Sequence, residues 1–229
     1  MIDLYFAPTP NGWKISVMLE ECGLDYSVKW VNIGAGEQFE PEFLAISPNN
    51  RIPAIVDHDP IEGEGPISVF ETGAILLYLA NKAEKFLPKD LPGQIAATEW
   101  LMWQMGGLGP MMGQHGHFKL YAPDRIAYAT ERYRNEVLRL FGVMDRRLAE
   151  HHYLAGSEYS IADMACFPWV QTYKRQEINL SDFPNVQRWY EILKQREGLR
   201  RGMALGRDKI NRNPQDDAEV RKTLFGIKE

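Results

Sequence analysis

Residues 2–15, IDLYFAPTPNGWKI, decide how the first part of this 229-residue chain folds. The apolar run at residues 2–7 predicts a strand, and Pro8 and Pro10 end it because proline lacks the N–H that a strand ladder needs. The apolar residues that follow recur with the spacing of one helix face: Ile15, Met18, Leu19 and Cys22. Gly23 is placed to end that helix. The chain therefore begins with a strand, a tight turn and a helix.

The next segments continue this alternation. Strand patterns cover residues 26–33, 52–57 and 66–70, and a helical pattern covers residues 71–82. The stretch HDPIEGEG between the last two strands predicts a hairpin turn, because glycine and proline favour turn conformations. The order β-α-β followed by β-β-α is typical of an α/β unit in which helices pack against a small sheet.

A second region is almost wholly helical. Polar residues and prolines predict a linker over residues 83–91. The longest apolar stripe after it has helical spacing and comprises Tyr133, Val137, Leu140, Phe141, Met144 and Leu148. In the stretch YSIADM, Ser160 is placed as a helix N-cap and Asp163 as the third helical residue, which is the pattern of a capping box. From residue 206 on the sequence is polar, and we expect a tail on the surface.

Composition argues against several classes of function. The net charge is −5 and no basic stripe occurs, so we expect no nucleic-acid partner. No apolar run approaches the roughly 20 residues that span a bilayer, and the first residues lack the pattern of a secretory signal. We therefore expect a cytoplasmic protein without membrane attachment. The two cysteines, Cys22 and Cys166, lie far apart in helical patterns, and His115 and His117 lack a third ligand, so no metal is expected.

Three motifs together resemble the glutathione transferase superfamily. NRIPAIVD, residues 50–57, resembles the segment that carries the cis-proline of the family, here Pro53. FETGAILLYLA, residues 70–80, resembles its Glu-Ser helix start, and YSIADM resembles the buried capping box of its second domain. FAPTPNGWKI, ISPNNRIPAIVD and WQMGGLGPMMGQ are similar to stretches of the bacterial Nu class.

The resemblance implies a fold with defined parts. It predicts an α/β thioredoxin-like amino-terminal domain at residues 1–82 and an all-α carboxy-terminal domain at residues 92–205. Residues 83–91 form the linker between them. The polar tail at residues 206–229 matches no motif of the family.

The resemblance also implies an activity. Members of the Nu class are glutathione-dependent disulfide-bond reductases with weak peroxidase and transferase activity. We therefore expect a homodimer that binds two glutathiones, or one oxidised glutathione, and acts on small disulfides or electrophiles. A glutathione transferase that conjugates electrophiles would use the same site, and a non-catalytic glutathione-binding regulatory scaffold would keep the fold without the chemistry.

The same resemblance assigns a residue to each charged group of glutathione. Glu71 corresponds to the residue that receives the γ-glutamyl ammonium. Thr72 stands at a helix start, where backbone N–H groups favour the γ-glutamyl carboxylate. Arg51 and Gln38 are placed for the glycyl carboxylate. Taken without the resemblance, Glu71 and Thr72 would be a favourable helix start and Arg51 a solvated surface charge.

Three further residues complete the expected binding site. Ile52, next to the cis-proline Pro53, would offer its backbone to the cysteinyl unit, as in strand addition by a peptide. Arg132 matches an arginine that reaches the ligand from the helical domain, either within one subunit or across the dimer. Without the resemblance, Arg132 would be part of a charged helix face.

The turn before the first helix contains no cysteine, serine or tyrosine, so the ligand has to bring the sulfur. Thiolate is the reactive form, and lowering a thiol pKa from 8.5 to roughly 6.5 takes about 2.7 kcal/mol. A helix N-terminus contributes about 0.3–2 kcal/mol, and each hydrogen bond to a charged group about 1.5–3 kcal/mol. We therefore predict that Thr9 and Asn11 stabilise a bound thiolate. Either residue is also a good helix N-cap, and both roles can coexist.

Overall fold

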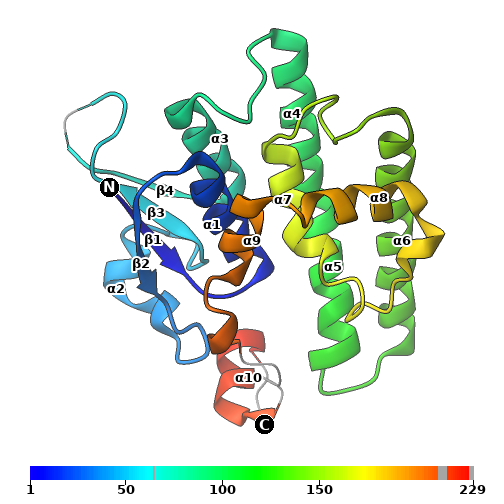
Figure 1. Ribbon diagram of the computed structural model, residues 1–229. Coiled ribbons are helices and arrows are strands. Elements are labelled where there is room, and N and C mark those ends of the chain that lie inside the picture. The colour runs from blue at the N-terminus through cyan, green and yellow to red at the C-terminus, as the bar shows by residue number, and fades with distance from the viewer. Residues whose placement is uncertain (64, 211–215, 227–229) are drawn as a thin grey trace.

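Four strands form one mixed sheet in the computed structural model, which describes residues 1–63, 65–210 and 216–226 (Figure 1). The strands are β1 (Ile2–Phe6), β2 (Tyr26–Trp30), β3 (Ala54–Asp57) and β4 (Ile67–Phe70). Their order is β2-β1-β3-β4, with β2 parallel to β1, and with β1–β3 and β3–β4 antiparallel. The parallel pair needs the crossover helix between β1 and β2, and the hairpin turn joins the last two strands.

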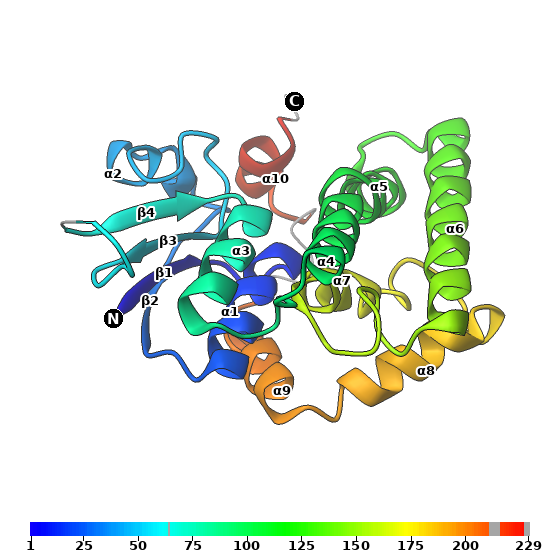
Figure 2. The ribbon, with the colours of Figure 1, turned by 90° about the horizontal axis from the view of Figure 1, so that it is seen from above.

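Helices cover both faces of this sheet. Helices α1 (Pro10–Cys22) and α3 (Thr72–Ala83) lie on one face, and the short α2 (Pro41–Leu44) lies on the other (Figure 2). Alternation along β3 separates the two layers, because Ile55 belongs to the large core and Ala54 packs with Phe43 in a small core under α2. The predicted thioredoxin-like arrangement is confirmed.

Helix α1 begins and ends where the sequence predicts. The Thr9 hydroxyl accepts a hydrogen bond from the Gly12 N–H at 3.1 Å, and Pro10 occupies the first helical position, where its missing N–H is not needed. Gly23 ends the helix at φ +70°, a left-handed conformation that glycine adopts without a Cβ clash. The cap fixes the direction of the first helical turn, which carries Asn11.

The second domain is helical, as expected. Its helices are α4 (Leu91–Trp103), α5 (Gly109–Gly116), α6 (Ala127–Glu150), α7 (Ile161–Val170), α8 (Pro184–Leu193) and α9 (Glu197–Ala204). Turns of π-helix at Gln104–Leu108 and His117–Tyr121 flank α5. No helix within the described ranges is long and apolar enough to cross a membrane.

The polar segment after residue 205 contains helix α10 (Ala218–Phe225), which lies beside both domains (Figure 1). A Cβ added to Gly34, in the loop after β2, would stand 3.3 Å from a Val220 methyl group. The Phe225 ring stacks on Tyr121 with ring centroids 4.8 Å apart. Helix α10 therefore links the loop after β2 to the end of the second π-helical turn. Residues 211–215 and 227–229 of the predicted tail lie outside the described residues.

Helix α1 belongs to the packing of both domains. It contacts α7 and, more extensively, α9. The closest approach is at Gly202, where an added Cβ would stand 2.5 Å from the Val17 Cα. The Ser16 hydroxyl donates a hydrogen bond to the Gly202 carbonyl at 2.8 Å. Since any side chain at this position would displace α1, the junction of the two domains requires glycine.

The predicted capping box at α7 is confirmed and extends beyond the helix start. The Ser160 hydroxyl accepts a hydrogen bond from the Ala162 N–H, and Asp163 Oδ2 accepts one from the Ser160 N–H at 3.0 Å. The buried Asp163 carboxylate also accepts hydrogen bonds from the Leu154 N–H at 3.0 Å and from the Trp189 indole at 2.8 Å. One carboxylate thus joins α7, the preceding loop and α8.

We predict that Asp163→Ala lowers the free energy of unfolding by about 3 kcal/mol, because it leaves several buried donors without an acceptor at about 1–3 kcal/mol each. Urea denaturation followed by circular dichroism measures the change. Asp124→Ala, at an exposed position, is the matched control and should change stability by less than about 0.5 kcal/mol. Equal stability of the two variants would contradict the role of Asp163.

Candidate functional site

A cleft of about 540 Å³ lies where the two domains meet. Its walls come from the start of α1, the segment before β3, the start of α3, the first π-helical turn with α5, and α7. The predicted residues that line it are Asn11, Arg51, Ile52, Pro53, Glu71 and Thr72. A cleft of this size with a few polar groups converging on it is typical of a small-molecule site.

The segment before β3 forms one wall. The Ile52–Pro53 peptide bond is cis, as the resemblance predicts. The buried Ser47 hydroxyl donates a hydrogen bond to the Arg51 carbonyl at 2.9 Å and holds this segment in place. The Arg51 side chain is exposed at the cleft, where it can meet an anionic group of a ligand.

Glu71 and Thr72 stand together at the start of α3. Glu71 has φ +67°, a conformation that is costly for a residue with a Cβ and that concentrates at binding sites. The Asn49 amide donates a hydrogen bond to the Glu71 carboxylate at 3.2 Å. Thr72 is buried at the first helical position of α3 and lines the cleft. The N–H groups of the first helical turn have no partner within the helix, and they therefore lie at the cleft. This end of the cleft can bind a carboxylate beside an ammonium group.

The orientation of the Asn11 amide is set by a residue from the other domain. The Trp169 indole N–H donates a hydrogen bond to Asn11 Oδ1 at 3.0 Å. Because an indole N–H can only donate, it must face the oxygen of the amide. Asn11 Nδ2 therefore points the other way and donates to no group among the described residues. The N-terminal end of α1 thus offers two N–H donors of a fixed side chain to a ligand in the cleft.

Thr9, Gln38 and Arg132 do not line the cleft within one chain. The Thr9 hydroxyl caps α1, which confirms the N-cap interpretation and leaves the hydroxyl hydrogen for another partner. Gln38 is buried, and its amide donates a hydrogen bond to the Ile33 carbonyl at 3.2 Å. Thiolate contact by Thr9 and ligand contact by Gln38 stay predictions.

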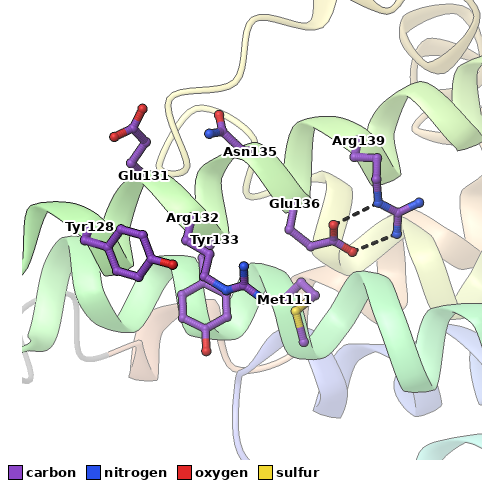
Figure 3. A pocket seen from close by; sticks show the side chains of 8 residues that line it. All are labelled: Met111, Tyr128, Glu131, Arg132, Tyr133, Asn135, Glu136 and Arg139. Atoms are coloured by element: carbon purple, nitrogen blue, oxygen red, sulfur yellow. Dashed lines mark hydrogen bonds and ion pairs between the residues drawn. The ribbon is translucent and has the colours of Figure 1, made fainter.

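Arg132 lies in a second, more open groove of about 760 Å³ on α6 (Figure 3). The groove is lined by Met111, Tyr128, Glu131, Arg132, Tyr133, Asn135, Glu136 and Arg139. Glu136 and Arg139 form a pair of hydrogen bonds at one end of it, at 2.7 and 2.8 Å. Within one chain, Arg132 therefore lies apart from the cleft that Asn11, Glu71 and Thr72 line.

Lys14, Gln104 and Trp169 are among the residues of the cleft that the sequence interpretation missed. The Lys14 ammonium donates hydrogen bonds to Gln104 Oε1 at 2.6 Å and to Thr72 Oγ1 at 3.2 Å. Burial lowers the pKa of Lys14 to about 7. The spacing of Asn11 and Lys14, three residues apart on one helix, could have shown that both share a face.

Both cysteines are unsuited to catalysis. Cys22 and Cys166 are free and buried. Burial raises the pKa of Cys22 to about 11 and the pKa of Cys166 well above its usual value. Since thiolate is the nucleophile, burial and a raised pKa both disfavour thiol exchange by either side chain. Within the described ranges, no group of three or more histidine, cysteine, aspartate and glutamate residues is placed to hold a metal ion.

Two of the glycines between Trp103 and Gln114 lie at the cleft, and one of them allows close packing. A Cβ on Gly109 would stand 2.6 Å from the Gln104 amide nitrogen, and a Cβ on Gly113 would stand 3.5 Å from the Trp169 ring. Both glycines line the cleft. Gly109 lets the Gln104 and Trp169 side chains lie close to α5, whereas a Cβ at Gly113 would make only an ordinary contact.

Comparison with known proteins agrees with this geometry. The models for the amino-terminal and carboxy-terminal domains of glutathione S-transferase match residues 2–81 and 106–197. The disulfide-bond oxidoreductase YfcG of Escherichia coli strain K12 is 55% identical over 196 residues, which cover 86% of this chain and 91% of YfcG.

Two solved structures are similar along most of their length. A glutathione transferase family member from Pseudomonas fluorescens, with two glutathiones bound, has a TM-score of 0.84 and 42% identity, covering 88% of this chain and 92% of that one. A glutathione transferase from Pseudomonas putida, with one glutathione disulfide bound per subunit, has a TM-score of 0.85 and 41% identity, covering 89% and 91%.

We predict that Asn11→Ala exposes the Trp169 indole N–H and speeds its hydrogen exchange about fivefold, because a hydrogen bond of about 1 kcal/mol is lost. Nuclear magnetic resonance of the indole groups measures the rate, and Trp169→Phe identifies the signal. Asn49→Ala, which changes another asparagine of the cleft, should leave the rate unchanged. Unaltered exchange in Asn11→Ala would contradict the proposed orientation of the amide.

Proposed function

Because this chain belongs to the glutathione S-transferase family, we propose that it is a glutathione-dependent disulfide-bond reductase of the Nu class acting in the cytoplasm. The observation that carries the proposal is the cleft itself. It has polar groups for both ends of glutathione and N–H donors at α1, whereas the cysteines of the chain are buried away from exchange. Such a site is suited to a ligand that brings its own thiol.

Glutathione fits the cleft with its γ-glutamyl end at α3. The Glu71 carboxylate receives the ammonium, and the N–H groups at Thr72 receive the adjacent carboxylate. The Ile52 backbone pairs with the cysteinyl unit, and Arg51 lies within the same wall for the glycyl carboxylate. In this orientation the cysteinyl sulfur points to the N-terminal end of α1.

Asn11 and the end of α1 then stabilise the thiolate. One hydrogen bond to a charged group contributes about 1.5–3 kcal/mol, and the helix end contributes up to about 2 kcal/mol. Together they supply the roughly 2.7 kcal/mol that lowers a thiol pKa by two units. The fixed Asn11 amide adds little reorganisation cost when the ligand binds.

The thiol chemistry takes two exchanges. The bound thiolate attacks one sulfur of a substrate disulfide, forms a mixed disulfide and releases the other sulfur as a thiolate, which takes up a proton. A second glutathione thiolate attacks the glutathione sulfur of the mixed disulfide and releases the second substrate thiol. The products are oxidised glutathione and a reduced substrate, so two electrons pass from two glutathiones to one disulfide. Holding both glutathiones side by side makes the second exchange intramolecular in effect. Weak peroxidase and transferase activity would use the same thiolate.

Glutathione-dependent reduction of hydroxyethyl disulfide, coupled to glutathione reductase, tests the proposal. We expect Cys22→Ala/Cys166→Ala to retain most of the wild-type rate, because neither thiol reacts. Asn11→Ala should lose about 10- to 150-fold in kcat/KM, which corresponds to one hydrogen bond to a thiolate.

Chlorodinitrobenzene turnover in the same preparations tests the conjugating transferase. A folded wild-type protein that accelerates only conjugation would support that alternative, and one that binds glutathione without accelerating either reaction would support the regulatory scaffold. Loss of reduction in the double cysteine variant, with the fold intact, would show that a protein thiol takes part.

We also propose that the active form is a homodimer in which Arg132 reaches the cleft of the other subunit. Arg132 is exposed on α6 and apart from the cleft of its own chain. Large apolar side chains are also exposed in the helical domain, with Leu91, Ile95 and Met102 on α4 and Tyr128 on α6. Burial of such exposed apolar side chains would favour association with a second copy.

A heterodimer of Asn11→Ala and Arg132→Ala subunits tests this arrangement. Each homodimeric variant has two impaired clefts, whereas the heterodimer has one cleft with both residues intact if Arg132 acts across the interface. We expect the heterodimer, purified through two different tags, to show about half of the wild-type activity per dimer. If Arg132 acts within its own subunit, the heterodimer stays as impaired as the two homodimers.

A further inference from the structure

Lys14 is a buried amine at the floor of the cleft. It lines the cleft but is only 2% exposed. Its Nζ has three neighbours: Gln104 Oε1 at 2.6 Å, Thr72 Oγ1 at 3.2 Å and Met105 Sδ at 3.7 Å. All three are neutral acceptors, and they come from α3 and the first π-helical turn. Among the residues that the structure describes, a protonated Lys14 therefore has hydrogen-bond partners but no counter-charge in contact.

Two titratable groups act on Lys14, namely Cys166 and Glu71, but neither places a negative charge in contact with its ammonium group. Cys166 faces it from α7, but burial raises the pKa of this thiol well above its usual value and keeps it neutral. Glu71 acts from the start of α3, where its carboxylate is exposed and accepts a hydrogen bond from Asn49. The first π-helical turn presents Gln104 and Met105, which do not titrate. Desolvation is the main reason why the pKa of Lys14 falls to about 7.

Thr72 connects Lys14 to the ligand. Because the Lys14 ammonium donates to Thr72 Oγ1, the hydroxyl hydrogen of Thr72 is free to donate elsewhere. In the structure this hydroxyl donates to Met105 Sδ at 3.2 Å, and a thioether sulfur is a weak acceptor. A carboxylate at the start of α3 would be a better acceptor. It would also bring a negative charge close to the amine.

We propose that Lys14 takes up a proton when an anionic ligand occupies the cleft, so that binding of the γ-glutamyl carboxylate and protonation of this lysine are coupled. The identity of the ligand rests on the function proposed above. The proton comes from solvent and converts the neutral amine to an ammonium, and no other bond is made or broken. Lys14 thus acts through Thr72 as a positioning residue for the carboxylate.

The coupling has a definite pH dependence. Below about pH 7, Lys14 is charged with or without ligand, so its contribution to affinity is complete and does not change with pH. Above that pH the empty cleft holds a neutral amine, and binding must draw a proton from solvent. Affinity therefore falls as pH rises, by up to about tenfold per pH unit, until the pKa of the occupied state is passed.

Calorimetry with S-methylglutathione at pH 8, in phosphate and in Tris, measures the protons taken up on binding. The probe has no free thiol, and its amine titrates equally in every variant. Wild type should take up as much as one proton more than Lys14→Met. Its affinity should approach that of Lys14→Met at high pH and exceed it at low pH.

Gln104→Glu is an isosteric second variant that retains the lysine. It places a carboxylate against Nζ, where the amide oxygen now stands at 2.6 Å, and should keep Lys14 charged in the empty cleft. We expect this variant to bind the probe without extra proton uptake. Circular dichroism shows whether each variant is folded. Equal proton uptake by wild type and Lys14→Met would overturn the proposal.

Lysine titration by nuclear magnetic resonance separates this proposal from the proposed function. In the free wild-type protein, the Cε signal missing from Lys14→Met should titrate near pH 7 and shift upward when the probe is added. A Lys14 pKa above about 9 in the empty cleft would overturn the coupling whatever the ligand. Failure of wild type to bind S-methylglutathione would overturn the function, whereas binding without proton uptake would overturn only the role of Lys14.

Discussion

The close packing of α1 against the helical domain is the constraint on which the site depends. Gly202 allows α9 to lie against the backbone of α1 at Val17, and Ser16 adds a hydrogen bond there. Nearer its N-terminal end, the same helix carries Asn11 and Lys14. Each forms a hydrogen bond with a residue of the second domain, Asn11 with Trp169 and Lys14 with Gln104. The donors of the cleft therefore acquire their positions only when the two domains are packed together. Packing of the two domains therefore also positions the donors of the site.

Features that depend on neighbouring residues could be predicted from the sequence. Thr9 and Gly23 cap the two ends of α1 through contacts with residues a few positions away. Ser160 and Asp163 form the capping box of α7 within one helical turn. The cis peptide bond before Pro53 was predicted from the family motif and not from a local physical rule. These local rules, joined in chain order, indicated an α/β unit followed by a helical region, whereas the family resemblance supplied the thioredoxin-like fold and the residues of one wall of the cleft.

The remaining parts of the site depend on contacts between distant segments. Trp169 lies 158 residues from Asn11, and Gln104 lies 90 residues from Lys14, so no spacing rule relates them. Periodicity places Lys14 beside apolar residues on α1, but burial of its amine depends on how α3 and the π-helical turn close over it. A buried amine without a contacting carboxylate is costly, and such a cost is typical of functional sites rather than of structural cores.

The burial of Cys22 and Cys166 has a consequence for how long the enzyme survives under oxidative stress. Enzymes that use their own cysteine lose activity permanently when that sulfur is driven to the sulfinic or sulfonic acid. In the function proposed for this chain the reacting sulfur belongs to a diffusible tripeptide and leaves with each product. An over-oxidised glutathione can dissociate and be replaced by a reduced one, so the protein itself stays unmodified.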